Sequence, residues 1–238
     1  MLQNNKSKLN KFENEAKTLF TGASRELRKE VRRWPALLAM VFIGGAYAIL
    51  SDRLTVGPSW LLLVFLIILA VPAIISRIKG NHQLNHLLLL AVCSLVTLAE
   101  VISITLLLAS LPDKSIGADS LLRDAGLLWG SNIVIFSLWY WQIDGGGPYA
   151  RSHESCQDYR LQAELLFPVL TLVEQRAKFS EWRPGFIDYL FVAFNTSTAF
   201  SPTDTPVLST RLKVLSMVQA VVSLITLATL AARAINIL

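Results

Sequence analysis

The sequence predicts an all-α integral membrane protein with about five transmembrane helices, a re-entrant half-helix and an N-terminal amphipathic helix. Of its 238 residues, 53% are hydrophobic and 16% are charged, whereas a soluble domain carries about 25% charged residues. Its mean hydropathy is +0.49, and several apolar runs approach the length of about 20 residues that crossing a bilayer requires. The net charge of +5 does not indicate a nucleic-acid partner, because Lys and Arg lie at the ends of apolar runs, as membrane insertion requires.

Residues 1–34 form a basic N-terminal segment. Because anionic lipid stabilises each Lys or Arg near its surface by roughly 1 kcal/mol, we expect an amphipathic helix on the cytoplasmic membrane surface. A solvated charged helix is the alternative. The segment is too long and too acidic for a secretory signal. Its apolar side chains recur at helical spacing: Leu9, Phe12, Ala16, Leu19 and Phe20.

For residues 35–142, the sequence predicts a four-helix transmembrane bundle. A short turn, 51–58, joins the first two spans, so they form an antiparallel hairpin. The fourth span ends in the aromatic residues Trp139-Tyr140-Trp141, which are typical of a membrane interface. The four expected spans are about 34–50, 60–75, 87–109 and 125–141.

Glu100 lies near the middle of the third span. A carboxylate there costs roughly 2.5–3.5 kcal/mol on insertion scales, and such residues face the bundle interior or a water path. Two alternatives remain open. Glu100 takes part in ion or proton handling, or it is a protonated acid that forms a hydrogen bond with Asn132 or a hydroxyl group.

For residues 143–187, the sequence predicts a polar or interfacial loop. Within it, we expect Asp144-Gly-Gly-Gly-Pro148 to be a flexible hinge. This glycine run lacks the Gly-Lys-Ser/Thr of a phosphate-binding loop. Most Lys and Arg residues lie in the N-terminal segment, in the 76–86 loop and after Trp141. The positive-inside rule therefore predicts that the N-terminus and this loop are cytoplasmic.

The last part of the chain, 188–238, predicts a re-entrant loop followed by a terminal transmembrane helix. The apolar run 189–194 is too short to span a bilayer, and a hydroxyl-rich stretch, 195–204, follows it. The apolar run 208–235 is long enough to span. Non-helical backbone at membrane depth must be buried in protein or line water, so this region is the candidate functional site.

The terminal helix carries one polar face, which we call the polar seam. A polar face on a helix in lipid lies against either a partner helix or a water path, because lipid leaves hydroxyl groups unpaired. The seam is therefore either pore-lining or a helix–helix contact, and both alternatives remain open. Its residues recur every three or four positions: Ser216, Gln219, Ser223, Thr226, Leu230 and Arg233, of which all but Leu230 are polar.

The stretch Phe194-Asn-Thr-Ser-Thr-Ala-Phe-Ser-Pro-Thr-Asp204 resembles the pore helix and filter of tetrameric potassium-type channels. The resemblance implies a homotetramer with a pore-like re-entrant half-helix and an ion-conducting path. Ser201 and Thr203 replace the filter glycines and Pro202 replaces the tyrosine, so a potassium-selective carbonyl filter is not expected. Any conduction of monovalent or divalent cations would use the filter-like residues Thr196, Ser197, Thr198, Ser201, Thr203 and Asp204.

A wider resemblance covers most of the chain. The stretch 139–148, with Asp188-Tyr189 and 199–204, resembles an uncharacterised family of bacterial multi-pass membrane proteins with this channel-like C-terminus. It implies location in the bacterial inner membrane and brings no activity with it.

The sequence contains no enzyme motif, no catalytic residues, no metal-ligand spacing and no cofactor signature. The expected partners are membrane lipids and further copies of the chain. Three functional hypotheses remain: a channel-like oligomer conducting ions or small polar solutes, a non-conducting membrane scaffold or sensor that retains a pore-like fold, and a proton-coupled carrier using Glu100.

Overall fold

A computed structural model describes residues 34–58, 60–112, 117–153, 159, 161–171, 182–201 and 204–235. Every regular element in this part of the chain is a helix, which confirms the all-α prediction. The expected amphipathic helix at 1–34 lies outside the described residues, apart from Trp34.

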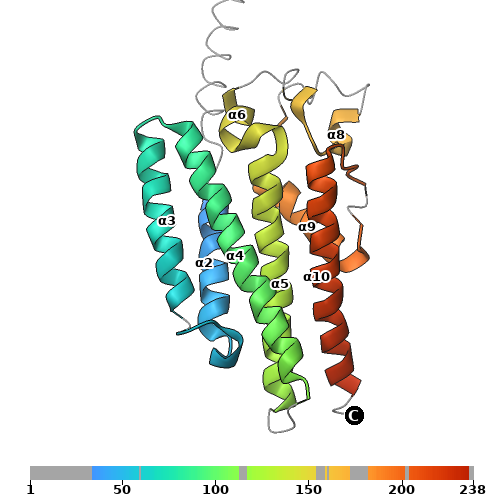
Figure 1. Ribbon diagram of the computed structural model, residues 1–238. Helices are drawn as coiled ribbons and strands as arrows, with labels where there is room; N and C mark the ends of the chain where they lie inside the picture. The colour runs from blue at the N-terminus through green and yellow to red at the C-terminus, as the bar shows by residue number, and fades with distance from the viewer. Residues whose placement is uncertain are drawn as a thin grey trace, which may run out of the picture. The chain divides into compact units, whose positions relative to one another are not determined.

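Five long helices form the body of the structure (Figure 1). Four of them are long and apolar enough to cross a membrane, and α2 is a shorter apolar helix of 16 residues. The predicted class of a multi-pass membrane protein is therefore supported by four helices rather than five. The five are α2 (Trp34–Ile49), α3 (Leu61–Ile78), α4 (His82–Ser110), α5 (Ala118–Ile143) and α10 (Thr210–Ile235).

The central helix is α5, against which α2, α4, α9 (Phe186–Ala199) and α10 all pack. In the most apolar stretch of the span that contains α5, 61% of the residues are buried, compared with 17% in α3. A helix that is apolar on all sides and largely exposed suits a lipid environment. The burial pattern therefore gives α3 a peripheral position and α5 a core position.

The start of α5 is tied to the turn between α2 and α3. The buried carboxylate of Asp124 accepts hydrogen bonds from the hydroxyl of Ser51 at 2.5 Å and from the guanidinium of Arg123 at 2.9 Å. Arg53, in the short helix η1 (Asp52–Leu54), lies 3.5 Å from the same carboxylate. The α2–α3 hairpin is thereby held at one end of α5.

The other end of α5 leads into a tight turn at Asp144-Gly-Gly-Gly. The turn comprises η2 (Asp144–Gly146) and continues into α6 (Gly147–His153). Gly145, Gly146 and Gly147 all have positive φ angles, of 54°, 72° and 94°, which side chains other than glycine adopt at a cost. The stretch expected to be a flexible hinge is thus a defined turn that directs Asp144 into the protein.

Replacing Gly145 with Ala should destabilise this turn. The new Cβ atom would lie 2.9 Å from the ring of Tyr159, and φ at this position is positive. We expect a loss of about 1–3 kcal/mol, visible as a lower thermal unfolding midpoint in detergent. Gly126→Ala is the matched control, because a Cβ at Gly126 meets no atom within 4 Å. Equal midpoints for the two variants would contradict this account of the turn.

Candidate functional site: a half-length helix held at both ends

The candidate site is built on α9, a helix of 14 residues and therefore about 21 Å long. It begins at Gly185, whose backbone N–H donates to the Asp188 carboxylate at 2.7 Å. It ends at Phe200, which has a φ of 54°. A left-handed conformation in a bulky residue is uncommon and marks a constrained position, so the helix ends at a defined point.

Contacts between α9 and α5 show how far along the axis of α5 the helix α9 extends. Near the start of α9, the hydroxyl of Tyr189 donates to the Asp144 carboxylate at 2.6 Å, at the end of α5. Near the end of α9, the hydroxyl of Ser197 donates to Asn132 Oδ1 at 3.0 Å. Asn132 and Asp144 are separated by about 18 Å along a helix axis. Since α5 begins at Ala118, α9 stops near the middle of α5.

After α9 the chain returns to the end at which α9 begins. Val207 pairs with Leu165 in an antiparallel bridge, and Leu208 donates its N–H to the Glu164 carbonyl at 2.8 Å. The N–H groups of Glu164 and Leu165 in turn donate to the Asp144 carboxylate. The segment therefore enters and leaves at the same end of α5, which we call the Asp144 end.

The Asp144 carboxylate organises that end. It is fully buried and accepts four hydrogen bonds, which come from the hydroxyls of Tyr159 (2.9 Å) and Tyr189 (2.6 Å) and from the N–H groups of Glu164 (2.7 Å) and Leu165 (3.1 Å). Hydrogen bonds to a charged group are roughly twice as strong as neutral ones. The cluster thus joins α5, the loop after α6 and the start of α9.

Two further features stabilise this cluster. The guanidinium of Arg151 donates to the backbone carbonyls of Trp141, at 2.8 Å, and Asp144, and lies 5.0 Å from the centre of the Tyr189 ring. Burial, reinforced by the Asp144 carboxylate, raises the pKa of Tyr159 well above its ordinary value. Tyr159 therefore remains a hydrogen-bond donor over the physiological pH range.

The start of α10 is attached to the same end by Glu164. Its carboxylate accepts hydrogen bonds from the Ser209 hydroxyl at 2.5 Å and from Arg211 Nε at 2.7 Å. Ser209 directly precedes α10, and Arg211 lies in its first turn. The backbone N–H of Glu164 donates to the Asp144 carboxylate. One short segment of loop thus connects the ends of α5, α9 and α10.

The polar seam of α10 packs against α9 and α5 of the same chain. Gln219 Nε2 donates to the Ala193 carbonyl at 2.7 Å and to the Ser197 hydroxyl at 2.9 Å. The hydroxyl of Ser223 donates to the Ser197 carbonyl at 2.8 Å, and that of Tyr140 donates to Gln219 Oε1 at 2.5 Å. These contacts are the helix–helix alternative that the sequence left open for Gln219 and Ser223.

Two of the remaining seam residues also have hydrogen-bond partners within the chain, Ser216 on α5 and Thr226 on α10 itself. The Ser216 hydroxyl lies 3.1 Å from that of Tyr140. Thr226 is buried and donates to the Val222 carbonyl of its own helix at 2.8 Å. The side chain of Arg233 lies outside the described residues. Within one subunit, Gln219, Ser223 and Thr226 therefore do not line an open path.

The filter-like residues fall into two groups. Thr196 and Ser197 are buried, and the Thr196 hydroxyl donates to the Val192 carbonyl at 2.8 Å. Thr198, Ser201 and Asp204 are exposed in the single chain, and Thr203 lies outside the described residues. The structure thus brings Thr198 and Ser201 to the exposed tip of α9, whereas Ser197 holds that tip in place.

Glu100 is fully buried in α4 and does not belong to this site. The hydroxyl of Tyr47 donates to Glu100 Oε2 at 3.4 Å. Glu100 Oε1 and Asn132 Nδ2 both lack a hydrogen-bond partner among the described residues, so the bond considered between these two side chains is not formed. The sequence also allowed a hydroxyl group as the partner of Glu100, and in the structure that hydroxyl group is the one of Tyr47.

Together, these features define an all-helical protein with four helices long enough to cross a membrane and a shorter helix, with a hydroxyl-rich end, that is hydrogen-bonded to α5 and α10. No protein-family model, no curated protein and no solved structure matches the chain. The two resemblances therefore rest on the residues quoted above and stay predictions.

The Asp144→Asn variant tests the cluster at the base of α9. Asparagine keeps one acceptor oxygen, but its NH₂ group would face the hydrogen-bond donors that now surround the carboxylate. We expect a loss of about 2–5 kcal/mol, measured as a lower thermal unfolding midpoint in detergent. Asp119→Asn, at the exposed start of α5, should leave the midpoint within the error. A midpoint unaffected by Asp144→Asn would contradict the role of this carboxylate.

Proposed function

We propose that the chain is the subunit of a channel-like homo-oligomer that passes cations or small polar solutes across a bacterial inner membrane. In this proposal α9 and the returning segment 200–209 form a re-entrant loop. The observation that carries the proposal is the course of the chain: α9 ends near the middle of α5, beside Asn132, and the chain returns to the Asp144 end.

The exposed tip of α9 supports an oligomer. Non-helical backbone at membrane depth is tolerated only where protein or water covers it. In the single chain Thr198, Phe200 and Ser201 are exposed, at the height where Ser197 contacts the middle of α5 and α10. If these helices span the bilayer, the tip needs a covering. Further copies of the chain, arranged around a water-filled axis, would cover part of the tip with protein and the rest with water.

Because the polar seam of α10 is occupied by contacts within the chain, the proposed path does not run along α10. Since Gln219 and Ser223 bond to α9, their role is to fix its depth rather than to meet the solute. The polar groups left for the path are the exposed Thr198, Ser201 and Asp204. Hydroxyl oxygens and a carboxylate are ligands that suit hard cations, and a ring of acidic side chains favours cations over anions.

The proposed orientation follows from the charge distribution. The positive-inside rule puts the N-terminus and the Asp144 end in the cytoplasm, so the re-entrant loop enters from the cytoplasmic side. A glycine-based potassium filter has no counterpart here, because Ser201 takes the place of a filter glycine. The tetramer is the state that the channel resemblance suggests.

Cation uptake into proteoliposomes tests the path. Asp204→Ala should lower uptake of K⁺ or Ca²⁺ by up to about tenfold, the effect of about 1.4 kcal/mol on a barrier. Asp119→Ala removes an equal charge from the exposed start of α5, far from the Asp144 end, and should leave uptake unchanged. Equal uptake by wild type and Asp204→Ala would exclude this path, and an oligomer without uptake would favour the scaffold or sensor.

A second candidate function is a proton-coupled carrier using Glu100. It is favoured by one observation: a fully buried carboxyl group in the middle of α4 has one oxygen without a hydrogen-bond partner among the described residues. Ionisable residues inside membrane helices commonly mark ion or proton pathways.

Glu100→Gln tests that candidate because glutamine keeps the shape of the side chain and removes its titration. For a proton-coupled carrier, the dependence of proteoliposome uptake on a pH gradient should disappear in the variant. Asp119→Asn, at the exposed start of α5, is a control for a carboxyl group outside α4. A gradient dependence that persists in Glu100→Gln removes the carrier from consideration.

A further inference from the structure

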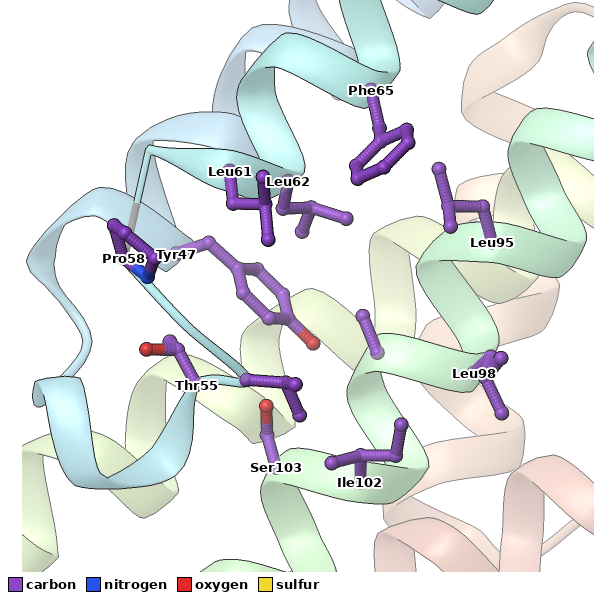
Figure 2. Close-up of a pocket in the computed structure, with 12 residues that line it drawn as sticks. Tyr47, Thr55, Pro58, Leu61, Leu62, Phe65, Leu95, Leu98, Ile102 and Ser103 are labelled. Carbon is purple, nitrogen blue, oxygen red and sulfur yellow. The ribbon is translucent and has the colours of Figure 1, made fainter.

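A cavity of about 210 Å³ lies between α2, α3 and α4, at the end of the helices opposite to Asp144 (Figure 2). Nine of its twelve lining residues are apolar, and none is Asp, Glu, Lys, Arg or His. An apolar cavity of about 150 Å³ in a soluble protein stays free of water and binds small hydrocarbons. This pocket is larger and open on one side, but its lining is likewise mostly apolar and uncharged, so it suits an uncharged apolar ligand.

The cavity is open towards the lipid-facing surface. Val56, Phe65 and Leu98 line it and are themselves exposed, by 66%, 46% and 59%. Phe65 belongs to α3, which has the smallest buried share among the four helices long and apolar enough to cross a membrane. A molecule dissolved in the hydrocarbon of the bilayer would therefore reach the cavity without passing through water.

Three of the lining residues carry a hydroxyl group, namely Tyr47, Thr55 and Ser103. Figure 2 shows the Tyr47 ring among the lining side chains with its hydroxyl directed towards α4. The Thr55 hydroxyl is engaged by its own loop, at 3.0 Å from the carbonyl oxygens of Asp52 and Gly57. The Tyr47 hydroxyl lies 3.4 Å from Glu100 Oε2, longer than the usual 2.5–3.0 Å of a hydroxyl hydrogen bond, and also contacts Ser103.

We propose that this cavity binds an uncharged amphiphile from the lipid phase. The apolar body occupies the space between Leu61, Phe65 and Leu95, and a hydroxyl or carbonyl oxygen of the ligand forms a hydrogen bond with the Tyr47 hydroxyl. The long contact to Glu100 leaves Tyr47 able to exchange partners. This site is independent of the re-entrant loop, so it stands whether or not the protein conducts.

Photolabelling of the full chain in nanodiscs tests the site with two matched probes. One is a hexadecanol that carries a diazirine group, and the other is the hexadecane with the diazirine at the same position. Mapping of the adducts should find both probes on the lining segments of α3 and α4, with the alcohol labelling several-fold more strongly. Adducts spread evenly over the exposed face of α3, or equal labelling by both probes, would overturn the proposal.

Three variants separate the cavity from its polar group. Ala99→Phe fills the cavity and should reduce labelling by both probes several-fold, whereas Ala91→Phe, at an exposed position of α4 outside the cavity, should not. Tyr47→Phe should lower labelling by the alcohol to the level of the alkane. Ala99→Leu replaces Ala99→Phe if the latter is not monodisperse. Wild-type labelling in the Ala99 variant, or an unchanged ratio in Tyr47→Phe, would refute the site.

Discussion

The hydrogen bonds to the buried Asp144 carboxylate are the interaction on which the rest of the structure depends. They connect the end of α5, the loop at Glu164 and the start of α9. Because a buried carboxylate without donors is very costly, the surrounding backbone and tyrosines are required in their places. The same loop residue, Glu164, holds the first turn of α10 through Ser209 and Arg211. The entry and the exit of α9 are thus set by one small cluster.

A second set of hydrogen bonds holds the far end of α9. Ser197 bonds to Asn132 of α5, and Gln219 and Ser223 of α10 bond to the backbone and hydroxyl of the tip. Buried polar groups without partners are costly, so the hydroxyl-rich end of α9 is stable between α5 and α10 because these helices supply its hydrogen bonds. Anchoring at both ends gives α9 a fixed depth, which a path along its exposed tip would need.

The hydrophobic pattern was sufficient to predict an all-helical chain with several helices long and apolar enough to cross a membrane and a shorter helix at α9, because length and apolar content depend on local sequence. The periodicity of Ser216, Gln219 and Ser223 also identified one polar face on α10. It could not distinguish a pore from a helix contact, since both need polar groups on one face. The glycine run after Asp144 suggested flexibility, whereas three positive φ angles make it a defined turn. An acidic residue directly before a glycine run was the available signal for a buried anchor.

The sequence by itself determined that the chain forms long apolar helices and that a hydroxyl-rich stretch precedes the last of them, although residues 195–199 of that stretch turned out to be helical. Only the tertiary structure decided that Ser197 supports the tip while Thr198 and Ser201 remain exposed. It alone brought Tyr47 to Glu100 across 53 positions of sequence. The physical reason is that helix formation depends on neighbours along the chain, whereas the partner of a polar side chain depends on the rotation and height of the helix packed against it.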